Sequence, residues 1–473
     1  MTFGANNRCI TIKTKKGMKK ILFLVAAVAS IMLTACVKEE YNVSENAPVG
    51  TIEFTASFDA ETKTTLNNGK TEWLKGDEIS INGVKFTANE AGASVKFTNA
   101  ETPTGEFKAP FTAVYPYSSK LPATQTVSNG TFEDETVVSV AYIEERADVL
   151  NFKHVSSVIK FQVSTEGVKE LVFESNKDLA GAINVNKDAS YTVSNGSKTI
   201  TVKPKNGTFS TSETYYVSVL PTIGTANQDF AIKTEGVTVK SGNVKFVRNT
   251  IADAKSIEVK YVYLKPNANW ISSNARFAAY FFEGYNNIWV NMNDSDNDGI
   301  YSAVVPYSYT NVLFGRMNPS SEDNGWTQDT QIWNKTKDLI VPKDTENCYV
   351  VHIEEWSEGE GDWFTKDDAN NLLYLLPQSE WDKDNARFAA YFFGSGEKWV
   401  SMKKFITNKY YVVKPSGYSK VIFCRMNGSN NTNNWENKWN QTVDLSIPTN
   451  GNNTCTISDF WNGNGAKGAW SRK

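Results

Sequence analysis

The chain has 473 residues, of which 49 are Lys or Arg and 52 are Asp or Glu, so its formal net charge at pH 7 is −3. This balance gives no electrostatic basis for binding nucleic acid or an anionic membrane surface. Only two histidines are present, which argues against histidine-based catalysis and against a histidine-rich metal site. At about 100–200 residues per domain, the length predicts roughly three or four domains.

The N-terminal segment predicts export from the cytoplasm. Met18 is followed by two lysines and then by an apolar run at residues 21–32. This run is too short for a spanning helix and is typical of a signal peptide. We therefore expect translation to start at Met18 and the signal peptide to cover residues 1–35.

The end of the apolar run predicts a lipid anchor. The letters LTAC, ending at Cys36, resemble the lipobox of bacterial lipoproteins, in which the cysteine is acylated and becomes the mature N-terminus. The alternative is an ordinary cleavage site that precedes a cysteine. Lys38-Glu39-Glu40 resembles a surface-export signal of some Gram-negative lipoproteins. Together these resemblances imply attachment to outer-membrane lipid through acylated Cys36, a tether at residues 36–48, and display on the cell exterior.

Residues 49–260 predict a β-rich first half that carries no catalytic or metal-binding motif. Runs such as GTIEFTASF and DEISINGVKFT alternate apolar and polar residues and are separated by turn residues. No phosphate-binding loop, nucleophile elbow or zinc spacing occurs there. His154 lies in the alternating run NFKHVSSVIKF and is expected to be a structural histidine.

The phrases TKTTLNNGKTEWLKGDEISI, LNFKHVSSVIKFQV, YYVSVLP and FVRNTI occur in this half in that order, and together they resemble fimbrillin-like proteins. The resemblance implies two stacked β-sandwich domains, at 49–150 and 151–260, of the kind found in surface lipoproteins and pilus subunits. We expect this half to act as a spacer.

The second half contains one module twice. The nonamer NARFAAYFF occurs at 274–282 and again at 385–393, and further blocks match in the same order. Two copies of about 100 residues indicate a domain duplication rather than a solenoid. We place the repeats at 261–366 and 367–473. The predicted fold class for the whole chain is all-β, with tandem β-sandwich domains.

Strand periodicity divides the nonamer between two faces. Phe277, Ala279 and Phe281 share an apolar face that suits a core, whereas Arg276 and Tyr280 share the other face, part of which we expect to stay wet. The second copy repeats this pattern. A pyranose can lie with its C–H face on a flat aromatic ring while its hydroxyls meet polar groups at the rim. The candidate carbohydrate-binding residues are Tyr280, Trp289, Arg316, Trp333 and Asn334 in the first copy, and Tyr391, Trp399, Arg425, Trp439, Asn440 and Gln441 in the second.

The ordered blocks NARFAAYFF, WV-x-M, F-x-RMN and WN-x-T-x-DL resemble starch-binding carbohydrate-binding modules of family 26. The resemblance implies a non-catalytic β-sandwich that binds α-glucans through aromatic side chains. Its stacking tyrosine corresponds to Tyr280 and Tyr391, and its tryptophan to Trp289 and Trp399. An insertion just before Trp333 in the first copy leaves the alignment of Trp333 and Trp439 with the family's motif ambiguous. No catalytic residue, cofactor or metal is predicted.

Other interpretations remain open at this stage. The aromatic residues of a small sandwich are often core, and the chain would then be a fimbrial subunit or adhesin whose partners are surface proteins. A hydrolase would need a pair of carboxylates, and the candidates in the first copy are Glu354, Glu355 and Glu358. The second copy offers only Asp459 in the corresponding region. Asp294, Asp296 and Asp298 resemble the start of a calcium loop but are expected to form a polar turn. Three later cysteines are expected to be core residues rather than disulfides: Cys348, Cys424 and Cys455.

Overall fold

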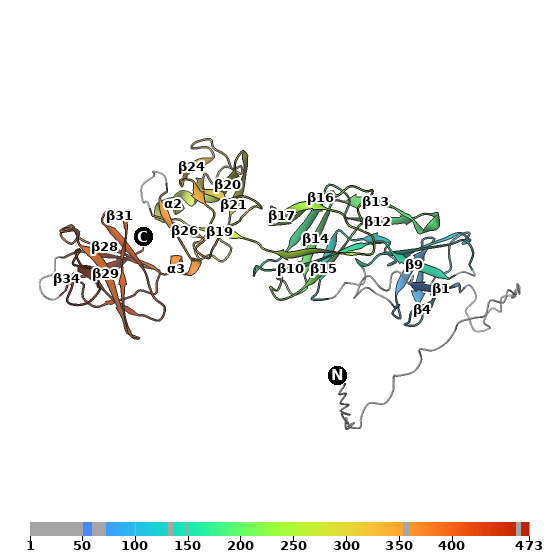
Figure 1. The fold of residues 1–473 in the computed structure, drawn as a ribbon, viewed down its shortest axis with the longest axis horizontal. Helices are drawn as coiled ribbons and strands as arrows, with labels where there is room; N and C mark the ends of the chain where they lie inside the picture. The colour runs from blue at the N-terminus through green and yellow to red at the C-terminus, as the bar shows by residue number, and fades with distance from the viewer. Residues whose placement is uncertain are drawn as a thin grey trace, which may run out of the picture. The chain divides into compact units, whose positions relative to one another are not determined.

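The computed structural model describes residues 51–58, 72–99, 101–130, 136–146, 149–352, 359–459 and 465–472. Strands dominate these residues, and the helices are single short turns, which confirms the predicted all-β fold class (Figure 1). No helix in the described ranges has the length and apolarity that a bilayer crossing requires. The predicted signal peptide, Cys36 and the tether lie outside the described residues, as do Glu354, Glu355 and Glu358.

The first group of strands closes into a barrel with the order β1-β4-β3-β2-β5-β8-β9. Closure comes from β1, which pairs in parallel with β9 at Ala56–Leu150 and Phe58–Phe152. A two-sheet sandwich was expected here, but alternation along a strand shows only its faces and not its partners. Trp73 is fully buried in the barrel core. The strands are β1 (Glu53–Phe58), β2 (Glu78–Ile81), β3 (Val84–Ala88), β4 (Ser94–Asn99), β5 (Phe111–Tyr115), β8 (Ser139–Ile143) and β9 (Leu150–His154).

The second group forms three sheets, with the orders β15-β10-β18, β17-β16-β11-β14-β7 and β13-β12-β6. Residues 120–127 join these sheets although they precede β8 and β9 in the chain. The elements are β6 (Lys120–Leu121), β7 (Thr124–Val127), β10 (Ser157–Val163), β11 (Leu171–Ser175), β12 (Ala180–Val185), the 3-10 turn η2 (Lys187–Ala189), β13 (Tyr191–Ser197), β14 (Thr199–Pro204), β15 (Tyr215–Val219), β16 (Gln228–Thr234), β17 (Val237–Val244) and β18 (Ile251–Ile257).

The first repeat consists of two sheets around one core, with the orders β22-β19-β26-β27 and β21-β20-β23-β24; β25 also pairs with β23. Phe277, Ala279 and Phe281 lie in that core, as their periodicity predicted. Trp270 is also buried there. The elements are β19 (Tyr261–Lys265), α2 (Ala268–Ile271), the 3-10 turn η3 (Ser272–Asn274), β20 (Arg276–Glu283), β21 (Asn286–Met292), β22 (Tyr301–Val304), β23 (Asn311–Met317), β24 (Ile332–Lys335), β25 (Leu339–Ile340), β26 (Cys348–Val351) and β27 (Gly361–Phe364).

The second repeat has the corresponding pair of sheets, β31-β32-β28-β36-β37 and β30-β29-β33-β34, with β35 on β33. Trp381 occupies the place of Trp270 in its core. The elements are α3 (Lys366–Asn370), β28 (Leu372–Leu376), β29 (Arg387–Phe393), β30 (Glu397–Ser401), β31 (Lys403–Ile406), β32 (Lys409–Val413), β33 (Lys420–Met426), β34 (Lys438–Gln441), β35 (Leu445–Ser446), β36 (Thr454–Ile457) and β37 (Gly468–Ser471).

Cys348, Cys424 and Cys455 are free and buried, as their positions predicted. Burial raises the pKa of each thiol to about 12. They are therefore inert core residues at neutral pH.

Candidate functional site: two aromatic clusters

Each repeat carries a cluster of three aromatic rings on the outer face of one sheet. In the first repeat the rings are Tyr280, Trp289 and Trp326, and the three centroid separations are 4.8–4.9 Å. In the second repeat they are Tyr391, Trp399 and Trp435, with separations of 4.7–5.0 Å. We call these the first and second aromatic clusters.

Two of the three rings come from a β-hairpin whose register brings them together. Tyr280 of β20 lies directly opposite Trp289 of β21, and Tyr391 of β29 lies opposite Trp399 of β30. Directly opposed residues on one face have close Cβ atoms, so large rings there must touch. The hairpin register therefore brings together four of the aromatic residues that the sequence singled out.

A small apolar floor supports each cluster. Ala278, Met317 and Ile332 are buried beneath Trp289. The corresponding floor in the second repeat includes Ala389, Ile422, Cys424 and Met426. The first repeat has Gly315 where the second has Cys424, and a Cβ at Gly315 would lie 3.3 Å from the Trp289 ring. Trp289 thus packs closely on the backbone.

The third ring comes from a loop, and sequence reasoning missed it. Trp326 lies between β23 and β24, nine positions after Met317, and Trp435 lies nine positions after Met426. The extra residues of the longer first loop therefore follow Trp326 and leave the cluster intact. This shared spacing was the available signal, but it carries no strand periodicity.

The clusters combine open and covered rings. Trp326 is 47 % exposed and Trp435 is 43 % exposed, whereas Tyr391 is only 8 % exposed. Trp435 meets Tyr391 edge-on, with an interplanar angle of 66°. Trp399 and Phe393 also pack against this tyrosine, so the surrounding rings together cover it. The most exposed ring of each cluster is the loop tryptophan.

Arg316 and Arg425 were predicted beside the tyrosines, and the structure places them on the opposite face. Tyr280 pairs with Leu313, so the residues of β23 that share its face are 313, 315 and 317. Arg316 is 2 % exposed and donates to the carbonyl oxygens of Trp270, at 2.7 Å, and Ser272, at 2.7 Å. Both arginines are structural donors beneath the chain entering β20 and β29.

Arg425 repeats these contacts with the carbonyls of Trp381 and Lys383, each at 2.7 Å. Trp333 and Trp439 stack on the two guanidinium groups, with 4.5 Å and 4.7 Å between ring centroid and guanidinium carbon. Both predicted tryptophans therefore pack against the structural arginines and lie apart from the clusters.

The predicted amide side chains also fall into two groups, one away from the clusters and one near the second cluster. Asn334 and Asn440 lie opposite Arg316 and Arg425 in the sheet, away from the clusters. Gln441 lies opposite Cys424 and accepts a hydrogen bond from Lys438.

The ammonium of Lys438 is 5.0 Å from the Trp435 centroid, which brings Lys438 and its partner Gln441 to the rim of the second cluster. Partial burial and a hydrogen bond to Glu397 raise the pKa of Tyr391 at the same rim.

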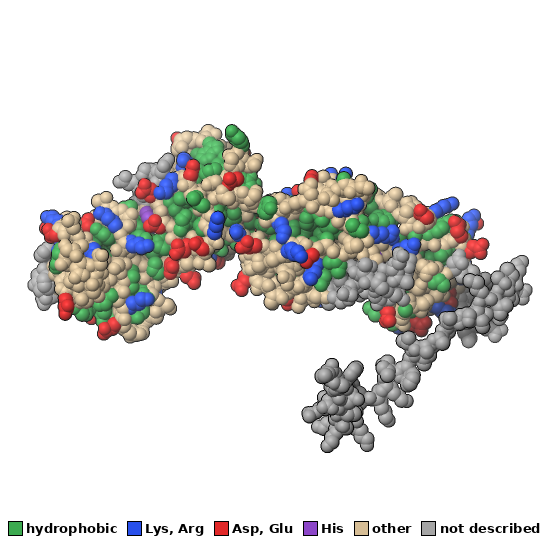
Figure 2. Space-filling view, in the orientation of Figure 1, with side chains coloured by type: hydrophobic (Ala, Val, Ile, Leu, Met, Phe, Trp, Pro, Cys, Tyr) green, Lys and Arg blue, Asp and Glu red, His purple; other side chains and the backbone are tan. Residues whose placement is uncertain are grey.

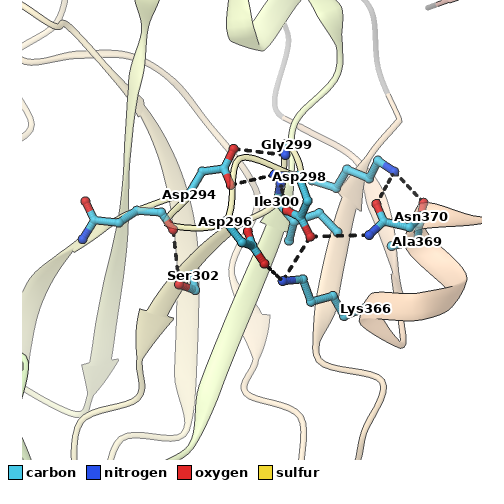
Figure 3. Close-up of polar contacts among 11 residues, drawn as sticks. Asp294, Asp296, Asp298, Gly299, Ile300, Ser302, Lys366, Ala369 and Asn370 are labelled. Carbon is cyan, nitrogen blue, oxygen red and sulfur yellow. Dashed lines mark hydrogen bonds and ion pairs between the residues drawn. The ribbon is translucent and has the colours of Figure 1, made fainter. Parts of the chain in front are cut away.

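Asp294, Asp296 and Asp298 form the polar turn that was expected, with their carboxylates close together (Figure 3). Asp294 accepts from the backbone N–H groups of Asp298, at 3.1 Å, and Gly299, at 3.0 Å. Lys366 forms ion pairs with Asp296, at 2.8 Å, and Asp298, at 3.1 Å. The ammonium thus already pairs with two of the three carboxylates.

On the face drawn in Figure 2, basic and acidic side chains are interspersed over the described residues, and neither sign of charge predominates. This distribution agrees with the near-neutral composition.

No family model and no curated protein sequence matches the chain. Among solved structures, the chain is similar to a putative cell adhesion protein from Bacteroides uniformis, with 18 % identity, 45 % of this chain and 94 % of the other covered, and a TM-score of 0.28. A putative cell adhesion protein from Bacteroides ovatus matches with 17 % identity, coverages of 39 % and 84 %, and a TM-score of 0.24. A Streptococcal ancillary pilin matches with 12 % identity, coverages of 66 % and 99 %, and a TM-score of 0.19.

Proposed function

We propose that this chain is a cell-surface lipoprotein that binds polysaccharide without catalysis, through the two aromatic clusters. The observation that carries the proposal is the duplication of one three-ring arrangement, each with a partly exposed tryptophan, at corresponding places in two repeats. Trp326 and Trp435 each leave almost half of their surface in water, where a ligand can reach the ring.

The chemistry of the clusters suits sugar rings. An exposed indole offers a flat apolar surface to the C–H face of a pyranose. Polar groups that can meet hydroxyls lie nearby: Asn291 and Asn324 in the first repeat, and Ser401, Asn433 and Lys438 in the second. Starch or a related α-glucan is the ligand class that the family-26 resemblance implies.

The same proposal places the protein at the outer membrane, anchored by acylated Cys36 and facing the exterior. The N-terminal β domains act as a spacer in this scheme. Their interaction with other surface or glycan-uptake proteins is part of the proposal, and so is the absence of enzymatic activity.

The competing function is a fimbrial subunit or adhesin that binds protein through its sandwiches. That function predicts buried tryptophans in the repeats. Trp270 and Trp381 fit this description, with 1 % and 0 % exposure, but Trp326 and Trp435 do not. The cluster tryptophans therefore favour a ligand-binding surface.

Affinity electrophoresis in starch-containing gels tests the proposal. The wild-type chain should be retarded, and the double variant Trp326→Ala/Trp435→Ala should migrate as in a gel without starch. Each alanine removes an open indole surface, and single aromatic anchors commonly contribute about 2 kcal/mol or more. Tyr117→Ala is a matched control, because this exposed aromatic belongs to the first half of the chain. Unretarded wild-type migration in starch, pullulan and dextran gels alike would exclude α-glucan binding.

A further inference from the structure

One arginine in each repeat binds the loop that carries the third ring. Arg276, the first residue of β20, donates from Nε to the carbonyl oxygens of Asn318, at 3.2 Å, and Ser321, at 2.9 Å. Its Nη2 donates to the carbonyl of Asp323 at 2.7 Å, and its Nη1 donates to the side-chain oxygen of Asn324. A single guanidinium thus holds several points of one loop.

Arg387 makes the corresponding contacts in the second repeat. Its Nε donates to the carbonyl of Asn430 at 2.5 Å, its Nη2 to the carbonyl of Thr432 at 2.8 Å, and its Nη1 to the side-chain oxygen of Asn433. Before the tryptophan the two loops, PSSEDNG and GSNNTNN, share only a serine and an asparagine at matching positions, so the arginine and that asparagine are the common elements of the contact.

The loops contain internal hydrogen bonds but bury few apolar side chains of their own. Between Asn318 and Trp326 the only apolar side chain is Pro319, and between Asn427 and Trp435 there is none. A segment that buries so little apolar surface gains little from packing and must be ordered by hydrogen bonds.

A further side-chain hydrogen bond joins each loop to the neighbouring strand. The amide of Asn324 donates to Asn291 Oδ1 at 2.9 Å, and the amide of Asn433 donates to Ser401 Oγ at 2.9 Å. In both repeats the asparagine that makes this tie is also the asparagine bound by the arginine.

We propose that Arg276 and Arg387 are positioning residues that hold Trp326 and Trp435 in place for ligand binding. They touch no ligand themselves. By fixing the loop backbone before binding, they remove most of the ordering entropy that a free loop would lose on contact with the glycan. The planar fork of arginine reaches acceptors on four loop residues in the first repeat and on three in the second, which the point charge of lysine cannot do. The effect on affinity rests on the proposed function, whereas the effect on loop order does not.

The experiment uses the full chain with Trp326→Ala, so that only the second cluster binds. In this background, Arg387→Lys is compared with Arg387, and Arg472→Lys is the control, because Arg472 is an exposed arginine outside the clusters. Three quantities are measured: the circular dichroism of the coupled Trp399–Trp435 pair, the melting temperature, and the affinity for maltoheptaose by calorimetry.

We expect Arg387→Lys to abolish the dichroism of the Trp pair, to weaken maltoheptaose binding about tenfold, and to leave the melting temperature near that of the control. An unchanged Trp signal in Arg387→Lys would overturn the proposal, and so would a lost signal with unchanged affinity. If the parent chain binds no maltoheptaose, the glycan function fails, while the dichroism still decides whether the arginine orders the loop.

A second variant covers misfolding of Arg387→Lys. Asn433→Ala removes one loop acceptor and the tie to Ser401 but leaves the arginine in the strand. We expect a reduced Trp signal and an intermediate affinity. A full signal with full affinity in Asn433→Ala would contradict the proposal, since the loop would then be ordered without these bonds.

Discussion

Each repeat contains two arginines whose side chains have different structural roles. Arg276 and Arg387 bind a loop on the cluster face, whereas Arg316 and Arg425 bind backbone carbonyls on the other face. Periodicity correctly separated the two faces of each strand, but it could not say which faces of adjacent strands coincide. That depends on register, which appears only when Tyr280 is seen opposite Leu313.

Replacing Arg425 with Met tests this division. The carbonyl oxygens of Trp381 and Lys383 would lose the guanidinium as a donor, so we expect the free energy of unfolding of the second repeat to fall by about 2–4 kcal/mol. Glucan affinity of the folded variant should be unchanged. Urea unfolding and calorimetry measure the two quantities, with Arg472→Met as control. Weaker binding at unchanged stability would instead support a sugar-contacting Arg425.

His154 is a structural histidine whose charge the fold opposes. It is 2 % exposed, and its Nδ1 lies 2.7 Å from Ser139 Oγ. Burial, with a contribution from the Arg248 charge, lowers its pKa to about 4. The unfolded chain binds the proton near pH 6.5, so this group makes the folded state less stable as the pH falls from about 6.5 towards 4.

An NMR titration of the imidazole C–H signals can check this value, because the chain has only two histidines. His154→Gln assigns the signal. We expect one signal to show no titration above about pH 5, and the pH dependence of stability in this range to weaken in His154→Gln. An imidazole that titrates near pH 6.5 in the folded chain would contradict the burial seen here.

At the scale of elements, the hairpins were more predictable than the loops. The alternation in NARFAAYFF separates core positions from Tyr280, and the matching WV block predicts the neighbouring strand of the hairpin. Trp326 and Trp435 have no such pattern, and the loops that carry them are hydrogen-bonded to an arginine about 50 positions earlier in the chain. Local propensity cannot encode contacts of that range.

At the scale of the whole molecule, duplication predicts avidity. Two linked sites on one polymer can exceed the affinity of either by up to about 10²–10⁴ when both engage together. We expect either single variant, Trp326→Ala or Trp435→Ala, to reduce the affinity for soluble starch by far more than half. The remaining site should keep its affinity for maltoheptaose. Calorimetry with both ligands measures this. A loss of only one half for starch would mean that the sites act independently.

The strand order could not be predicted at this scale either. The sequence predicts an all-β chain and its repeats, but it does not show that β1 closes a barrel with β9 or that residues 120–127 pair with β12 and β14. Such pairings join segments far apart in the chain, so they follow from the collective packing of the core rather than from any local run.

Parallel pairing recurs between early and late strands: β1 with β9, β10 with β18, β19 with β26 and β28 with β36. In a parallel pair, the start of the earlier strand and the end of the later strand lie at opposite ends of the ladder. Tension applied between the start of the earlier strand and the end of the later strand would therefore shear the β1–β9 and β10–β18 ladders along their length. Their hydrogen bonds would share the load instead of opening one by one.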